Sequence, residues 1–170
     1  MLLAIAAALA TSTCPIERGR YALRTDPTVT AAFHPTTVNN DWRGGVTLRI
    51  HIGSTGHDYW WLPWNGGTDD MRHVRLTRRV GEAKPPGDLR LGHDEDFWTT
   101  DAGYNMTEAV PKAGDAAPGH FLMPRLGRDL YYGTVQTEAR GKDGFDRGFF
   151  DLISCGAPNQ QVDVELPGIA

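Results

Sequence analysis

Hydrophobic and polar residues alternate one by one along much of the chain, which is the pattern of β-strands with one buried face. The clearest segment is residues 46–52, which reads Val-Thr-Leu-Arg-Ile-His-Ile. The turn sequence Gly-Ser-Thr-Gly follows at 53–56, and a second apolar and aromatic segment occupies residues 57–62. We predict a β-hairpin from these two segments, with Pro63 ending its second strand.

Similar patterns predict further strands elsewhere in the chain. They lie at residues 20–24, 28–34, 73–79, 130–137 and 147–155, with two shorter edge strands near 95–99 and 120–124. One short helix is expected over 104–110, where Pro111 would end it. The connections are too short for helical crossovers, so the strands should be antiparallel. The sequence therefore predicts an all-β, single-domain antiparallel β-sandwich or small β-barrel with at most one short helix.

The N-terminus has the features of a secretory signal peptide. Residues 2–10 form an uninterrupted apolar run that ends in the small-x-small sequence Ala-Leu-Ala. No Lys or Arg precedes the run, so a start further upstream and a buried N-terminal element are the alternatives. We expect a signal peptide at 1–10, one domain at 11–156 and a loosely ordered tail at 157–170. No later apolar stretch is long enough for a transmembrane segment, so the expected location is periplasmic or secreted.

Two cysteines, Cys14 and Cys155, follow the expected cleavage point. In an oxidising compartment an isolated pair forms one disulfide, whereas in the cytosol both would remain reduced thiols. The chain has no Cys-x-x-Cys motif, which excludes thioredoxin-like exchange and zinc-ribbon binding.

The charge balance and the missing motifs exclude several functions. Lys and Arg number 17 against 21 Asp and Glu, a net charge of −4 that argues against nucleic-acid binding. The phosphate-binding loop, the dinucleotide-binding glycine motif and the His-Glu-x-x-His zinc motif are all missing, so no cofactor is predicted. Six histidines are present without metal-ligand spacing, and no metal site is predicted.

The aromatic run Tyr-Trp-Trp-Leu-Pro-Trp at residues 59–64 supplies the candidate binding residues. Strand alternation places Tyr59 and Trp61 on one face, and Trp64 follows the proline into a loop. If that face is wet, the three rings form a platform for a sugar ring or another planar ligand. The alternative is that the rings fill gaps in the core.

The acidic sequence His-Asp-Glu-Asp at residues 93–96 supplies the candidate catalytic residues His93, Asp94 and Asp96. In an extended segment the two aspartates point one way, while His93 and Glu95 point the other, so only two of the four could chelate together. A solvated acidic loop is the preferred interpretation. A weak calcium site and a carboxylate pair for general acid–base catalysis are the alternatives.

We therefore expect an exported, non-catalytic module that binds a carbohydrate, a small molecule or an envelope protein through Tyr59, Trp61 and Trp64. The alternative is a hydrolase or lyase that acts on envelope polymers, with His93, Asp94 and Asp96 as its acid, base or metal-binding groups. A structural or inhibitory envelope protein is a third hypothesis.

Overall fold

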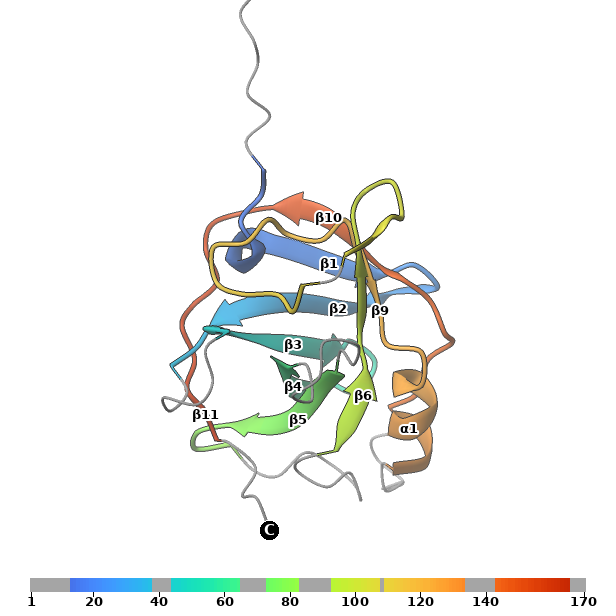
Figure 1. Ribbon diagram of the computed structural model, residues 1–170. Coiled ribbons are helices and arrows are strands. Elements are labelled where there is room, and N and C mark those ends of the chain that lie inside the picture. Colours follow the sequence, from blue (N-terminus) through green and yellow to red (C-terminus); the bar gives the residue numbers. More distant parts are fainter. Residues whose placement is uncertain are drawn as a thin grey trace, which may run out of the picture.

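The computed structural model describes residues 13–37, 44–64, 73–82, 93–107, 109–133 and 143–165. In these residues one antiparallel sheet curls into a half-barrel, which confirms the predicted all-β class (Figure 1). Because the strands share a single sheet, the architecture is closer to the predicted barrel than to a sandwich.

The elements are short and follow one another closely. The strands are β1 (Gly19–Leu23), β2 (Asp26–Pro35), β3 (Val46–Ile52), β4 (His57–Trp64), β5 (His73–Arg79), β6 (Asp94–Asp96), β7 (Trp98–Thr100), β8 (Met106–Thr107), β9 (His120–Leu122), β10 (Phe150–Cys155) and β11 (Val164–Glu165). A 3-10 turn, η1 (Ile16–Arg18), precedes β1, and the helix α1 (Leu126–Gly133) lies between β9 and β10 in the chain. The strand order is β11-β5-β4-β3-β2-β1-β10-β9-β7-β8, and β6 also pairs with β5.

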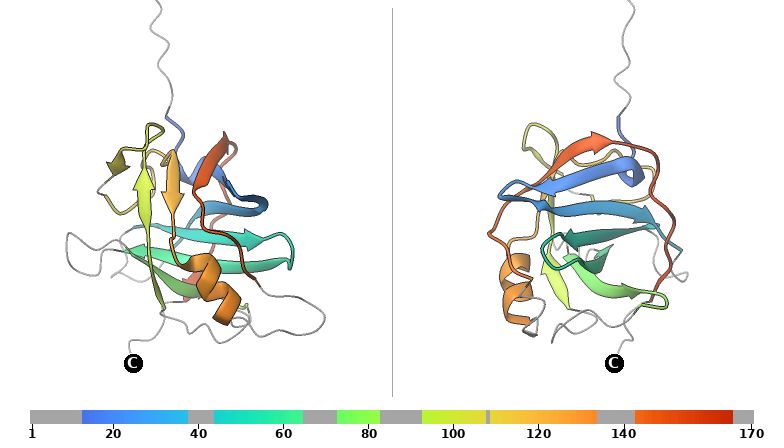
Figure 2. Two further views of the ribbon diagram at one scale, coloured as in Figure 1. Left: turned by 90° about the vertical axis from the view of Figure 1, so that its right-hand side faces the viewer. Right: turned by 180° about the vertical axis from the view of Figure 1, so that it is seen from behind.

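Residues 94–100 bring the two ends of the curled sheet together (Figure 2). Their first half, β6, pairs with β5, and their second half, β7, pairs with β9. The alternation continues through both strands, so that Glu95 and Phe97 are buried while Trp98 is exposed. The core-facing side of this connecting segment therefore carries the carboxylate of Glu95.

The core fills the inner face of the sheet with the alternating residues that the hairpin pattern predicted. Leu48 and Ile50 of β3 are fully buried, and their cross-strand partners in β4 are Trp61 and Tyr59. Phe121 of β9 stacks on Phe150 of β10, with ring centres 4.6 Å apart. The predicted pairings of β1 with β2 and of β3 with β4 are both present.

Two predictions about β4 and the C-terminal tail differ from the structure. Strand β4 continues through Pro63 to Trp64, because these two residues pair with Val74 and His73 of β5, whereas the pairing of β4 with β3 ends at Trp61. The missing N–H of Pro63 therefore removes no bond to β3. Within the expected tail, Val162 and Val164 are buried and cover the outer side of β4. The domain thus extends past its predicted end at residue 156.

Two further segments have a different secondary structure from the one predicted. Part of the expected strand at 130–137 belongs to α1, in which Leu126 and Leu130 are buried one helical turn apart, and residues 134–142 lie outside the described part of the chain. The expected helix at 104–110 is instead a turn leading into β8. The Asp101 carboxylate accepts hydrogen bonds from the backbone N–H groups of residues 103 and 105, and this local bonding competes with helix formation.

The predicted disulfide is present. It joins Cys14 to Cys155 with 5.8 Å between their Cα atoms, and it links the segment before η1 to the end of β10. The predicted signal peptide at residues 1–10 lies outside the described residues. Among the residues described, no helix has the length and apolar character needed to cross a membrane.

Candidate functional site

The aromatic candidates divide between the core and a salt-bridge cluster. Tyr59 and Trp61 are fully buried, so the face that they share is the core face and they form no exposed platform. These two rings instead fill the core, which was the alternative interpretation. Trp64 is half-buried at the end of β4, where its Nε1 donates to Asp94 at 3.2 Å. The guanidinium carbon of Arg75 lies 3.9 Å from its ring centre, a cation–π contact.

The catalytic candidates His93, Asp94 and Asp96 do not converge. Asp94 binds Arg75 through two parallel hydrogen bonds of 2.8 and 2.9 Å, from Nε and from a terminal guanidinium nitrogen. Asp96 places Oδ1 3.6 Å from Nδ1 of His73 on the neighbouring strand. Asp94 therefore forms an ion pair with Arg75 and Asp96 lies beside the His73 imidazole, both between β5 and β6, and His93 has a different set of partners.

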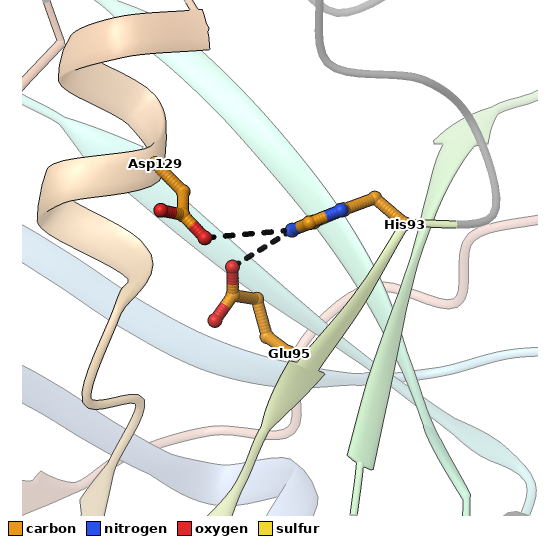
Figure 3. Close-up of side chains that lie close together, drawn as sticks. All are labelled: His93, Glu95 and Asp129. Atoms are coloured by element: carbon orange, nitrogen blue, oxygen red, sulfur yellow. Dashed lines mark hydrogen bonds and ion pairs between the residues drawn. The ribbon is translucent and has the colours of Figure 1, made fainter.

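His93 and Glu95 share a face, as strand alternation predicted, and a third residue joins them from α1 (Figure 3). His93 Nε2 lies 2.9 Å from Glu95 Oε1 and 3.7 Å from Asp129 Oδ2. One ligand atom from each of the three residues can be chosen so that all lie within 4.8 Å of one another. The sequence offered no signal for Asp129, because the contact depends on a helix that the pattern did not predict.

The electrostatics of this cluster are set by the burial of Glu95. Burial raises the pKa of Glu95, and the Asp129 carboxylate raises it further, although the hydrogen bond with His93 acts in the opposite direction. The hydrogen bond to Glu95 is the main cause of a raised pKa for His93. Burial would raise the pKa of Asp129, but its hydrogen bonds with Glu95 and Arg128 outweigh burial and lower it. The three titratable side chains therefore influence one another's protonation within one compact group.

A cavity of about 810 Å³ lies beside α1, between the helix, the β1–β2 turn and the loop at 143–149. Two exposed aromatic side chains of the helix, Tyr131 (45 % exposed) and Tyr132 (75 % exposed), line it. Their rings are perpendicular, with centres 5.2 Å apart. Sequence reasoning missed this pair because two adjacent tyrosines after a leucine are typical of a strand.

Charged side chains surround the two tyrosines. Arg128 and Arg147 line the same cavity as Asp26 and Asp146. The formal charges of these four side chains balance. The cavity can therefore donate and accept hydrogen bonds around an aromatic wall without a net charge from these residues.

Close backbone packing holds the cavity wall in place. A Cβ atom on Gly127 would overlap the carbonyl oxygen of Phe145, and one on Gly144 would lie 2.7 Å from Tyr131 Cδ2. Glycine at both positions therefore allows α1 and the loop to come into contact.

The loop is anchored at its start by Asp143, which is fully buried. The Tyr59 hydroxyl donates to Asp143 Oδ2 at 2.5 Å, and the Thr55 hydroxyl donates to Oδ1. His57 Nδ1 lies 2.5 Å from Oδ2. Burial raises the pKa of Tyr59, and the hydrogen bond to Asp143 adds to the effect. Tyr59 thus supports the wall of the cavity from within the core.

A smaller hollow of about 370 Å³ lies on the outer face of β1, β2 and β3. Arg49 and His51 line it, but each of them is 2.8 Å from an Asp58 oxygen, so Asp58 already engages both. The exposed large hydrophobic residue in its lining is Ile153, which is aliphatic. This hollow therefore lacks the exposed aromatic wall that distinguishes the cavity beside α1.

Comparisons with known proteins found no relative. No protein-family model matches the chain, and neither a curated protein nor a solved structure matches it. No family is assigned, and the functional conclusion depends on the chemistry of the cavity and its surroundings.

Proposed function

We propose that this protein is an exported, non-catalytic binding module that takes a neutral carbohydrate in the cavity beside α1. The observation that carries the proposal is the exposed pair Tyr131 and Tyr132 on the wall of the cavity. A flat aromatic ring offers an apolar face to the C–H groups of a sugar, and polar side chains at its edge bind the hydroxyls.

The charge distribution favours an uncharged ligand. Arg128 and Arg147 are balanced by Asp26 and Asp146 in the same lining, whereas a site for an anion needs an excess of cations. Carboxylates accept and guanidinium groups donate, so the set matches the mixed donor and acceptor character of sugar hydroxyls. A volume of about 810 Å³ lies within the range of roughly 300–1,000 Å³ that is typical of small-ligand sites.

The cavity wall is held before any ligand arrives. The contacts at Gly127 and Gly144 join α1 to the loop, and Asp143 fixes the start of that loop on the β3–β4 hairpin. A preformed wall reduces the entropy that binding would otherwise lose. This arrangement supports a binding role, because the exposed aromatic faces are presented by packed elements.

The export part of the proposal is supported by the disulfide, since such bonds persist in oxidising compartments. Expression of the full chain followed by cell fractionation and intact-mass analysis tests it. We expect oxidised protein outside the cytoplasm that has lost about the first ten residues as a signal peptide. An uncleaved cytoplasmic chain with two free thiols would contradict export.

The binding part is tested by saturation-transfer NMR with neutral hexasaccharides of glucose, N-acetylglucosamine, mannose and xylose as probes. We expect wild-type protein to bind at least one of them, and Tyr132→Ala to weaken that binding at least tenfold. The matched control is Trp98→Ala, which removes a 46 % exposed ring outside the cavity lining and should leave binding unchanged. Thermal melts should show both variants folded, because both side chains are exposed.

Two results would overturn the binding proposal. One is that wild-type protein binds none of the four hexasaccharides, and the other is that Tyr132→Ala binds as well as wild type. The sugars should also be recovered intact after incubation. Shortened or unsaturated products would instead favour the hydrolase or lyase alternative.

A further inference from the structure

Glu95 is an unusual residue for the core-facing side of a strand. Its side chain is 0 % exposed, and its Oε2 atom accepts no hydrogen bond from any described residue. Arg125 Nε lies 3.9 Å from that oxygen, beyond hydrogen-bond distance. A buried carboxylate oxygen without a hydrogen bond is costly, and a bound ion is one of the standard explanations for such an atom.

The carboxylate of Glu95 could share an ion with His93 and Asp129, and His93 lies against its other oxygen, Oε1. His93 Nε2 is 2.9 Å from Glu95 Oε1 and 3.7 Å from Asp129 Oδ2. Ligand atoms around a tetrahedral Zn²⁺ are separated by about 3.4 Å, as follows from bond lengths of about 2.0–2.2 Å. The observed separations lie on either side of that value. Figure 3 shows the three side chains pointing toward one another from α1 and the β6 segment.

The ligand atoms select the class of cation. One imidazole nitrogen with two carboxylate oxygens suits zinc and related transition metals, whereas Mg²⁺ and Ca²⁺ prefer oxygen ligands alone. Ca²⁺ also takes six to eight oxygens, more than these two carboxylates can supply. Three protein ligands leave the fourth tetrahedral position to water.

We propose that His93, Glu95 and Asp129 bind one divalent transition-metal cation, with Zn²⁺ as the best match. On binding, Nε2 of His93 coordinates the cation as neutral imidazole and the two carboxylates coordinate it as anions, so any proton on these ligand atoms is released to solvent. Metal binding in this site involves only coordination and proton release, and no atom changes its oxidation state. The ion would join β6 to α1, and the site does not depend on the carbohydrate proposal.

Calorimetric titration of the full, oxidised, tag-free chain with ZnCl₂ tests the site. We expect one Zn²⁺ per chain in wild-type protein, at least tenfold weaker binding in His93→Ala and in Asp129→Ala, and much weaker binding of CaCl₂ or MgCl₂. The control is His73→Ala. Its Nδ1 lies 3.6 Å from Asp96 Oδ1 in a similar imidazole–carboxylate pair between β5 and β6. This variant should bind Zn²⁺ like wild type.

Thermal melts and cobalt spectroscopy keep the test decisive if His93→Ala does not fold. Asp129 is on the helix and its side chain is 20 % exposed, so Asp129→Ala is expected to remain folded. Zn²⁺ should raise the Tm of wild type and His73→Ala but not that of Asp129→Ala. Co²⁺ should give the visible absorption of a tetrahedral centre in wild type and lose it in Asp129→Ala. Absence of zinc binding by wild type, or equal zinc binding by Asp129→Ala and wild type, would overturn the proposal.

Discussion

Trp61 is held in the core almost entirely by apolar contact. It lies between Leu48 of β3 and Leu76 of β5 in the cross-strand register, and all three side chains are fully buried. Its Nε1 atom is buried and has no hydrogen-bond partner among the described residues. The indole therefore stabilises the fold through its buried apolar area. Burial of the N–H group without a hydrogen bond offsets part of that stabilisation.

We predict that Trp61→Ala lowers the free energy of unfolding by about 3–5 kcal/mol, the cost of truncating a large buried ring. Trp61→Phe should cost less, because it keeps an aromatic ring and removes the unpartnered N–H. Urea unfolding followed by circular dichroism measures both changes. The exposed control Trp98→Ala should change little, and a cost below about 1 kcal/mol for Trp61→Ala would contradict the burial of this ring.

His34 couples the stability of the fold to pH. Its Nδ1 lies 3.0 Å from the Gln160 carbonyl oxygen, and its ring packs edge-on against Trp60. Burial lowers the pKa of His34 below its ordinary value, and nearby arginines lower it further, although the contact with Gln160 opposes the shift. The folded state therefore favours the neutral imidazole.

We predict that His34 makes the protein less stable as the pH falls below about 6.5, the pKa of an unperturbed histidine. Below that pH His34 becomes protonated in the unfolded chain but stays neutral in the folded protein. The free energy of unfolding therefore falls as the pH falls, until the pH reaches the lowered pKa of His34 in the folded state. The measurement is the unfolding free energy of wild type and His34→Gln from pH 8 to pH 5. The difference between the two should change across this range, and a constant difference would show that His34 does not contribute to the pH dependence.

At the scale of elements, the hairpins were predictable and α1 was not. Residues 46–52 alternate strictly and lead into a glycine-containing turn, so local pattern and long-range packing agree. The helix covers only eight residues, and its two buried leucines fit one turn of helix, while its tyrosines favour a strand. The turn at 101–105 depends on one carboxylate, Asp101, that bonds to its own backbone.

The candidate site was likewise predictable from the sequence only in part. Alternation correctly placed His93 and Glu95 on one face, but it could not show that this face is the core face or that Asp129 meets it. The cavity combines three segments that are distant in the sequence, so no local pattern contained it. The sequence pattern therefore suggested exposed aromatic rings in the β3–β4 hairpin, where Tyr59 and Trp61 are in fact buried. It did not indicate the exposed tyrosines of α1.

We predict that Gly127→Ala destabilises the protein and weakens carbohydrate binding. On helix propensity alone, alanine should stabilise α1 by up to about 1 kcal/mol, so the sign of the change is informative. The added Cβ would overlap the Phe145 carbonyl oxygen and separate the helix from the loop. Thermal melts should show a lower Tm for Gly127→Ala and little change for Gly156→Ala, whose Cβ would lie 3.9 Å from its nearest neighbour, in the Arg20 side chain. A raised Tm for Gly127→Ala would contradict the close packing.

At the scale of the whole molecule, the two ends of the described chain stabilise the sheet from outside. The disulfide joins Cys14 to Cys155 across 141 residues of sequence. Strand β11 pairs with β5, and Val164 helps to cover Trp60 and Leu62 on the outer side of β4. The C-terminal segment is therefore part of the domain, although its polar composition indicated a loose tail.

We predict that replacing Cys14 and Cys155 together with serine lowers the free energy of unfolding by about 2–5 kcal/mol, because the unfolded chain regains the freedom of a long loop. Urea unfolding of the double variant, compared with wild type with and without reductant, measures the loss. Reduced wild type should approach the variant in stability. Equal stability of oxidised wild type and the variant would show that the bond contributes nothing to the fold.

Mapping of amide chemical shifts during titration with the four neutral hexasaccharides shows whether ligand binds beside α1. We expect concentration-dependent shifts at the backbone amides of Thr25, Tyr131 and Gly144, which line the cavity. Amides next to Arg49 in the outer hollow should remain unchanged. Shifts centred on the outer hollow or on Trp64, or no shift with any of the four sugars, would show that the cavity beside α1 does not bind these ligands.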